Sequence, residues 1–201
     1  MSSQSLSPDR QDRRKERTRA ALISAAQQLI RDGRAPGSSI KNVTDLADVG
    51  LGSFYNHFES KEELFDAAVS AAMDEYLDWL DQNLPGGGDP VTRLFESVRL
   101  TGRLATELPA TAAVLGRRFA LLEPTSDALG LRMRTDVLAA VEAGNPGLNA
   151  QEIVTLLTAA TGAMQAVLSS VQSLTAEETA NAADVLARAV LRMLSLKHPA
   201  R

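Results

Sequence analysis

The chain has 201 residues, of which 44% are hydrophobic and 23% charged, and this length allows one domain or two small ones with a buried core. It contains no cysteine, which excludes disulfide frameworks, thiolate metal sites and cysteine nucleophiles. The net charge of -4 is unevenly spread, because residues 1–61 hold 10 Lys/Arg and 7 Asp/Glu whereas residues 62–201 hold 11 and 18. We therefore expect the two halves to face different partners.

The first 19 residues carry charges with no apolar stretch behind them, so neither a signal peptide nor a membrane anchor is predicted. The cytoplasm is the expected location. After residue 17, apolar residues recur at helical spacing and no stretch alternates over the length of a strand. The chain is therefore predicted to be all-α.

One longer helix and two short ones are expected first. The first runs over about Arg17–Arg31 and ends at Gly33. The second is capped by Ser39 and continues through Ala47. A three-residue turn, Asp48–Gly50, then leads into a third helix over Leu51–Phe58.

Longer helices are expected to follow. Ser60–Glu63 has the form of a capping box ahead of a helix that extends to about Asn83. After a flexible joint over Pro85–Gly88, Asp89 and Pro90 restart a helix, and further helices continue to about residue 144. Two final helices are expected over residues 150–173 and 176–197. The first of them is uncharged from Ile153 onward, and its recurring Thr and Gln, with apolar stripes on two sides, favour burial inside protein over a membrane span.

The most informative stretch is Asp48–Phe65, which reads DVGLGSFYNHFESKEELF. Its two glycines lack the third glycine, the preceding strand and the Lys-Ser/Thr pair of nucleotide-binding loops. Ser53 is not in a nucleophile elbow, and His57 has no nearby second histidine, which argues against a hydrolase and a metal site. Neither a cofactor nor a metal is predicted. Two short helices joined by a three-residue turn have instead the spacing of a helix-turn-helix motif that binds DNA.

Residues 52–64, GSFYNHFESKEEL, resemble the signature G-x-x-Y-x-H-F-x-x-K-x-x-L of the tetracycline-repressor-like (TetR/AcrR) transcriptional regulators. The resemblance covers roughly residues 17–69. It departs at Arg34, which replaces the usual aromatic residue, at Asp48, which replaces a turn glycine, and at Gly50, which replaces a Ser/Thr cap. It implies an N-terminal three-helix helix-turn-helix DNA-binding domain with a basic arm over residues 1–60, and a C-terminal helical effector-binding and dimerisation domain over residues 61–201.

The same resemblance implies that a homodimer binds double-stranded operator DNA. It assigns contacts to the DNA phosphates and backbone to Ser39, Lys41, Tyr55 and Lys61. It assigns contacts to the base edges to Leu51, Gly52, Ser53 and Asn56. Phe54 and Phe58 are expected in the core. His57 has two alternatives, a DNA contact or a structural role as a cap or beneath Lys61.

Two further features each have two interpretations. The six cations between Arg10 and Arg19 form either a solvated charge run or an arm that contacts phosphates or the minor groove. The candidate effector site consists of Met73, Tyr76 and Trp79 on one helix and Thr161 and Gln165 on another, which supply aromatic surface and polar anchors. The alternative is that the first three belong to the core, while the other two face solvent or bond to the backbone.

The predicted function is a homodimeric repressor that a small, mostly apolar effector releases from its operator. A helical enzyme and a protein-interaction module are the alternatives. The sequence offers no paired catalytic motif, metal cluster or cofactor loop for an enzyme, and salt-dependent DNA binding would separate the regulator from both.

Overall fold

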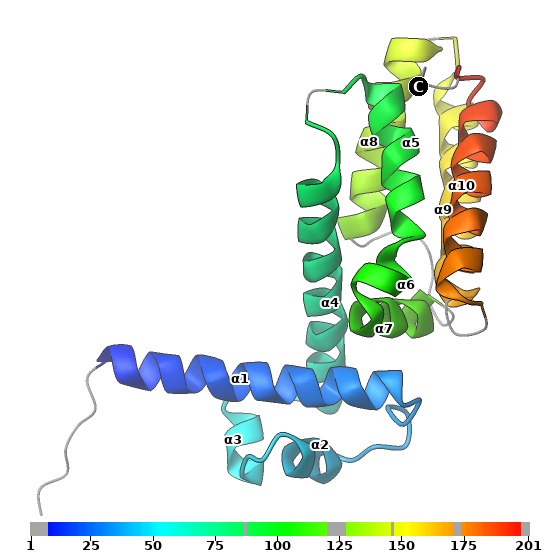
Figure 1. Cartoon of the computed structure of the whole chain (residues 1–201). Helices are drawn as coiled ribbons and strands as arrows, with labels where there is room; N and C mark the ends of the chain where they lie inside the picture. Colours follow the sequence, from blue (N-terminus) through cyan, green and yellow to red (C-terminus); the bar gives the residue numbers. More distant parts are fainter. Residues whose placement is uncertain (1–7, 87, 120–127, 146, 171–173, 198–201) are drawn as a thin grey trace, which may run out of the picture. The chain divides into compact units, whose positions relative to one another are not determined.

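The computed structural model of the chain describes residues 8–86, 88–119, 128–145, 147–170 and 174–197. Every regular element within these residues is a helix, which confirms the all-α prediction. The chain divides into two compact units, unit 1 (Met1–Ala71) and unit 2 (Ala72–Arg201), and the boundary lies inside helix α4 (Lys61–Asn83) (Figure 1). None of the described helices is long and apolar enough to cross a membrane.

Unit 1 contains α1 (Pro8–Arg31), α2 (Ile40–Leu46), α3 (Leu51–Tyr55) and the beginning of α4. The apolar stripe of α1 meets α2, which in turn packs on α3. The core side chains are each no more than 2% exposed and include Leu22, Ala26, Leu29, Val43, Phe54, Phe58 and Leu64. The expected core role of Phe54 and Phe58 is confirmed, and their rings lie 6.0 Å apart between centroids.

Two helix ends of unit 1 differ from the prediction. Helix α1 begins at Pro8 and not near Arg17. The prediction missed its first turns because they have no apolar residues at helical spacing. Helix α3 ends at Tyr55 and not at Phe58. The amides of His57 and Phe58 both donate to the carbonyl of Phe54, at 2.9 and 3.0 Å, and this turn takes the chain out of the helix.

The start of α4 also differs in one detail. The amide of Glu63 donates to the hydroxyl of Ser60 at 3.1 Å, as a capping box requires. The Glu63 carboxylate, however, accepts from the amide of Glu59 at 2.6 Å and so reaches one residue further back than expected. Both bonds still satisfy amides at the helix entrance.

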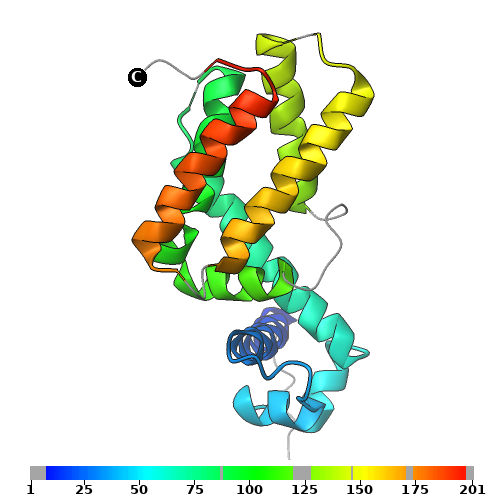
Figure 2. The same ribbon diagram turned by 90° about the vertical axis from the view of Figure 1, so that its right-hand side faces the viewer.

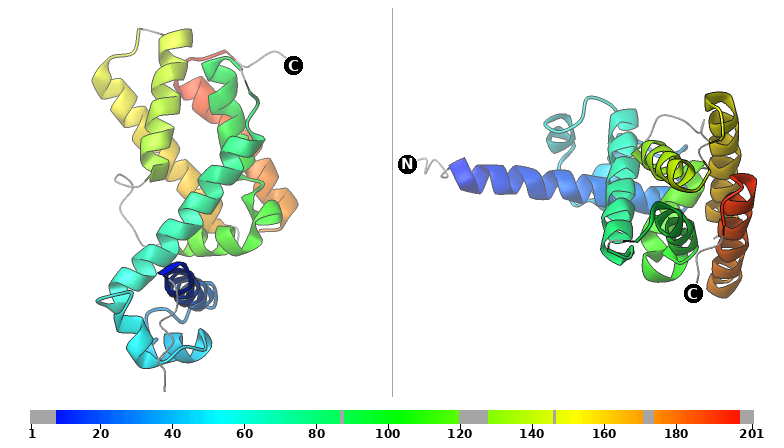
Figure 3. Two further views of the ribbon diagram at one scale, coloured as in Figure 1. Left: turned by 90° about the vertical axis from the view of Figure 1, so that its left-hand side faces the viewer. Right: turned by 90° about the horizontal axis from the view of Figure 1, so that it is seen from above.

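Unit 2 continues α4 and adds six helices, α5 (Pro90–Thr101), α6 (Leu104–Glu107), α7 (Pro109–Phe119), α8 (Ala128–Gly144), α9 (Ala150–Ser170) and α10 (Ala176–Met193). The views show α5 and α8 between α4 on one side and α9 with α10 on the other (Figures 1 and 3). Helices α9 and α10 run side by side (Figure 2). The expected caps of α5, α9 and α10 are confirmed, because the amides of these helix starts donate to Asp89, Asn149 and Thr175.

Small residues and ion pairs fix the contacts inside unit 2. A Cβ at Gly102 would overlap the Cβ of Ala183 and lie 3.0 Å from the carbonyl of Thr179, so glycine is needed where α5 meets α10. Arg132 of α8 bonds Asp81 of α4 at 2.7 Å and the buried Asp136 at 3.1 Å. The bond to Asp81 joins α8 to α4, while the bond to Asp136 lies within α8.

Helix α9 is not buried on both sides within a single chain. Ala160, in one of its apolar stripes, is 2% exposed, whereas Ala159, in the other, is exposed. Val154 of the same helix is 47% exposed and Val185 of α10 is 56% exposed. Apolar surface on the last two helices therefore remains uncovered in the described part of the chain.

Candidate nucleic-acid interface

The candidate interface is built on the two short helices of unit 1. Ser39 caps α2, because its hydroxyl accepts from the amide of Asn42 at 3.1 Å while the Ser39 amide donates to the Asn42 side chain at 2.8 Å. Asn42 thus stands where a capping box usually has Glu or Gln. Ser39 and Lys41, the two predicted backbone-contact residues of α2, are both exposed.

The turn between α2 and α3 explains how aspartate replaces the usual glycine. Asp48 has a φ of 52°, in the left-handed region. Aspartate enters this region more readily than most residues because its short polar side chain can bond locally. The amide of Val49 then donates to the carbonyl of Thr44 at 3.0 Å, which closes the turn and directs the chain into α3.

Helix α3 presents an uncovered surface. Leu51 is 53% exposed and Tyr55 60% exposed, although both are large apolar or aromatic side chains. Gly52 and Asn56 are exposed and Ser53 is half-buried. Phe54 is the buried anchor of the helix, and the Tyr55 ring lies edge-on to it at 5.2 Å. The predicted base-contact residues therefore lie on α3 and its C-cap, Asn56, and the outer face of this element is free within the described part of the chain.

No crowding within the described part of the chain requires glycine at the two glycine positions of this element. A Cβ added at Gly50 or Gly52 would meet nothing within 4 Å. Gly50 is the N-cap of α3, where glycine is tolerated. Gly52 lies inside the helix, where glycine costs about 1 kcal/mol relative to alanine. Close approach of another molecule would account for that cost.

The two predicted lysine contacts already have intramolecular partners. Lys41 is paired with Asp45 at 2.6 Å on the exposed side of α2. The Lys61 ammonium donates to the carbonyl of Ser38 at 3.1 Å and so ties the start of α4 to the segment before α2. Lys61 therefore has a structural role in addition to the predicted one.

His57 lies in the turn after α3 and is half-buried. Burial lowers its pKa, and the nearby cations Lys15 and Arg19 lower it further. The Arg19 guanidinium carbon lies 5.1 Å from the centroid of the Phe58 ring, which places α1 beside this turn. At neutral pH the imidazole is thus predominantly uncharged.

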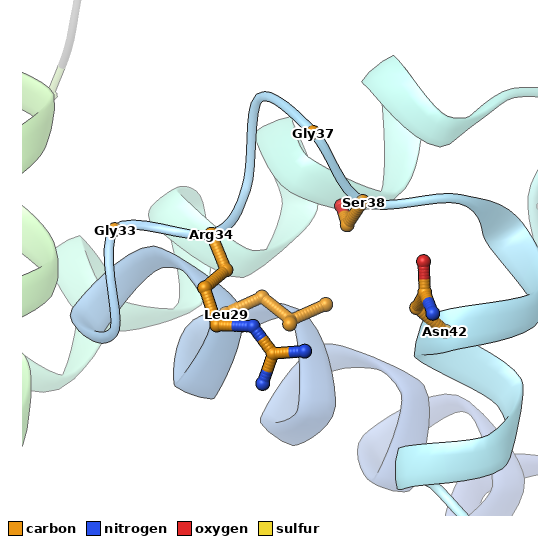
Figure 4. A pocket seen from close by; sticks show the side chains of 6 residues that line it. All are labelled: Leu29, Gly33, Arg34, Gly37, Ser38 and Asn42. Carbon is orange, nitrogen blue, oxygen red and sulfur yellow. The ribbon is translucent and has the colours of Figure 1, made fainter.

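An open hollow of about 300 Å³ lies between the end of α1 and the start of α2 (Figure 4). Its polar side chains are those of Arg34, Ser38 and Asn42, and none of the three was among the predicted contact residues. At Arg34 the replacement of the usual aromatic residue was a signal in the sequence. The other lining residues are Leu29, Gly33 and Gly37.

The predicted effector residues lie in unit 2. Met73 and Tyr76 are buried, and the Tyr76 hydroxyl is 2.7 Å from that of Thr101. Burial raises the pKa of Tyr76 to about 12, so the phenol stays neutral. Trp79 is half-buried and stacks on Tyr76 with ring centroids 6.5 Å apart. Thr161 and Gln165 are in α9, but their side chains lie outside the described residues.

The two candidate helices are separated by other elements. Helices α5 and α8 lie between α4 and α9 (Figure 3). Thr158, which belongs to the same polar stripe as Thr161, donates its hydroxyl to the carbonyl of Val154 at 2.9 Å. Thr158 thus faces solvent and also bonds to the backbone of its own helix. No group of three or more His, Cys, Asp or Glu suited to a metal ion occurs among the residues that the structure describes.

A short helix exposed over a buried aromatic anchor, set behind a capped helix and a tight turn, defines a helix-turn-helix protein. Family models match both units. Residues 22–68 match the model described as bacterial regulatory proteins, tetR family, and residues 89–200 match the tetracyclin repressor-like C-terminal domain. The chain belongs to the tetR family of bacterial regulatory proteins, a family of regulators and not of enzymes.

Two curated relatives match part of the chain at low sequence identity. The chain is 26% identical over 124 residues to the HTH-type transcriptional repressor DhaR of Mycobacterium sp. (strain GP1), which covers 62% of this chain and 60% of that protein. It is 31% identical over 62 residues to the repressor KstR2 of Mycolicibacterium smegmatis, covering 31% of this chain and 28% of that protein. The chain thus matches less than two thirds of either relative's length.

Solved structures agree over most of the chain. The structure of RolR in complex with the ligand resorcinol is similar with a TM-score of 0.60 and 26% identity, covering 92% of this chain and 91% of that one. A putative tetR family regulator from Shewanella sp. PV-4 has a TM-score of 0.71 at 17% identity, covering 87% and 96%. The second similarity concerns the fold alone.

Proposed function

We propose that the protein is a transcriptional repressor that binds operator DNA as a homodimer and has no enzymatic activity. The observation that carries the proposal is the outer face of α3, where Leu51 and Tyr55 are more than half exposed and Gly52 has open space around it. A recognition helix of this kind enters the major groove and reads base edges.

The contacts divide by chemistry. Tyr55 and Lys61 hold phosphate oxygens, as do Ser39 and Lys41 at the start of α2, while Leu51, Gly52, Ser53 and Asn56 face the bases. Lys41 would have to share its ammonium between Asp45 and a phosphate. Arg34 and Asn42, which line the hollow together with Ser38, are two further candidates for a phosphate contact. His57 keeps the turn compact as a neutral side chain.

A direct test is the retention of genomic fragments on the purified protein as the salt concentration rises. The proposal predicts a small set of fragments retained with strong salt dependence, because phosphate contacts release counterions. Equal retention of all fragments would contradict a sequence-specific regulator. Retention of none would contradict DNA binding altogether.

For the effector, we infer a small, mostly apolar molecule with one or two hydrogen-bonding groups, bound in unit 2. Because α5 and α8 lie between α4 and α9, we propose Tyr76 and Trp79 on one side and Thr161 and Gln165 on the other as two alternative places for it. The likeness to RolR, whose solved structure contains resorcinol, supports an aromatic ligand of this size. Tyr76 already bonds Thr101, so an effector would have to exchange that bond.

An effector that binds more tightly to the conformation with low DNA affinity releases the protein from DNA. DNA in turn weakens effector binding by the same factor by which the effector weakens DNA binding. Replacing Thr161 by Trp is expected to abolish release while DNA affinity is kept. Unchanged release by a set of small phenols in the Thr161→Trp variant would remove Thr161 from the site.

A further inference from the structure

The first twelve residues of α1, residues 8–19, form a helix that reaches beyond the packed part of unit 1. We call them the α1 extension. Apart from Pro8 they contain no apolar residue, and residues 11–17 are all exposed. The extension runs past α3, and no other described helix of unit 1 covers its first turns (Figure 1 and the right panel of Figure 3). A helix that is polar on every side does not contribute to a core.

The extension carries all of the excess positive charge of unit 1. Residues 8–19 hold six Lys/Arg and three Asp/Glu, a net charge of +3. Residues 20–71, which include the helix-turn-helix, hold four Lys/Arg and seven Asp/Glu, a net charge of -3. Without the extension, unit 1 would therefore meet the negative phosphate backbone with a negative charge of its own.

The cations of the remaining part are also partly engaged. Lys41 is paired with Asp45, and Lys61 donates to the carbonyl of Ser38. The extension, in contrast, ends next to the recognition element. Its last cation, Arg19, lies over the Phe58 ring at 5.1 Å, and Lys15, one turn earlier, is close enough to His57 to lower its pKa.

We propose that the α1 extension is a preformed helical arm that supplies most of the sequence-independent phosphate contacts of this protein, in addition to those of α2, α3 and Lys61, with Arg14, Lys15 and Arg17 among the contacting residues. The inference rests on the proposed DNA-binding function and deepens it. Base preference belongs to α3, whereas most of the salt-dependent affinity belongs to the extension. Asp9, Asp12 and Glu16 limit the net positive charge of the extension. Tight binding to a specific site therefore depends on both the extension and α3.

The test compares two triple variants with the same change in charge. The first, Arg14→Gln/Lys15→Gln/Arg17→Gln, neutralises exposed residues of the extension and keeps the contact of Arg19 with Phe58. The control, Arg103→Gln/Arg134→Gln/Lys197→Gln, neutralises three exposed residues of unit 2. Affinity of the full chain is measured against salt concentration for a retained duplex and an unrelated duplex of equal length, with thermal unfolding to check the fold.

The extension variant is expected to bind both duplexes about tenfold or more weakly at low salt, and its salt slope should fall by about 0.9 for each phosphate that it no longer neutralises. The control should keep the wild-type slope. Equal slopes for wild type and the extension variant would overturn the proposal and leave a solvated charge run. An equal decrease in affinity in both variants would also overturn it, since net charge alone would then be responsible. If the wild type itself binds no duplex, the proposed function fails instead, which is a distinguishable result.

Discussion

At the scale of single residues, Tyr55 and Lys61 share a predicted role but have different surroundings. The Tyr55 side chain is 60% exposed, and its hydroxyl has no hydrogen-bond partner in the described part of the chain. Lys61 donates to Ser38 and so also holds unit 1 together. Substitutions at the two positions therefore separate DNA contact from folding.

We expect Tyr55→Phe to weaken binding to all DNA sequences while the free energy of unfolding stays within about 0.5 kcal/mol of wild type. Lys61→Ala should weaken binding to all sequences, lower the salt slope by about one unit, and also destabilise unit 1 by about 1 kcal/mol because it removes the bond to Ser38. Fluorescence titration with duplexes and thermal unfolding provide both quantities. An effect confined to one base position would contradict the phosphate assignment.

The pKa of His57 reports on the same surface. Because burial, Lys15 and Arg19 lower it in the folded state, the unfolded chain binds more protons between the folded pKa and the ordinary value of about 6.5. Stability should then rise with pH across that window and be lost as the pH falls through it. His57→Gln should reduce this dependence. A folded-state titration midpoint above 6.5, measured by NMR on the imidazole, would refute the lowered pKa.

At the scale of elements, local signals predicted the starts of helices that carry a cap, but not the start of α1 or the end of α3. Ser39, Asp89 and Thr175 mark their helices because a cap acts through amides within three residues of it. The α1 extension escaped prediction because it has no apolar face, and the early end of α3 depends on the burial of Phe58, a tertiary effect. For the site, the order of the residues predicted which of them share α3, but not that Lys61 would bond Ser38.

Gly52 tests the recognition helix as an element. Alanine fits without contact in the free chain, so Gly52→Ala should leave unit 1 equally stable or more stable by up to about 1 kcal/mol. DNA binding should nevertheless weaken at least tenfold if α3 closely approaches the bases. Chemical unfolding and duplex titration on the same preparation make the comparison. Unchanged DNA affinity would place Gly52 away from the groove.

At the scale of the whole molecule, the apolar surface that α9 and α10 leave uncovered in the described part of the chain is where we expect a second copy of the chain to bind. Ala163 is half-buried on α9, and Ala163→Glu is expected to shift the molecular mass by light scattering from dimer to monomer and to abolish operator binding. Ala139→Glu, at an exposed position of α8, is the matched control and should leave both unchanged. A dimer in the Ala163→Glu variant with normal operator binding would exclude this face as the interface.

Whether α3 reads DNA sequence can be measured by selecting binding sites from a random duplex library with wild type and Asn56→Ala. Wild type is expected to enrich an inverted repeat, since a two-fold dimer places its two recognition helices in symmetric half-sites. Asn56→Ala should lose preference at one symmetric pair of positions, by about 1 to 3 kcal/mol, and keep the rest. A wild type that enriches no sequence, or a variant that weakens every position equally, would contradict this role of α3.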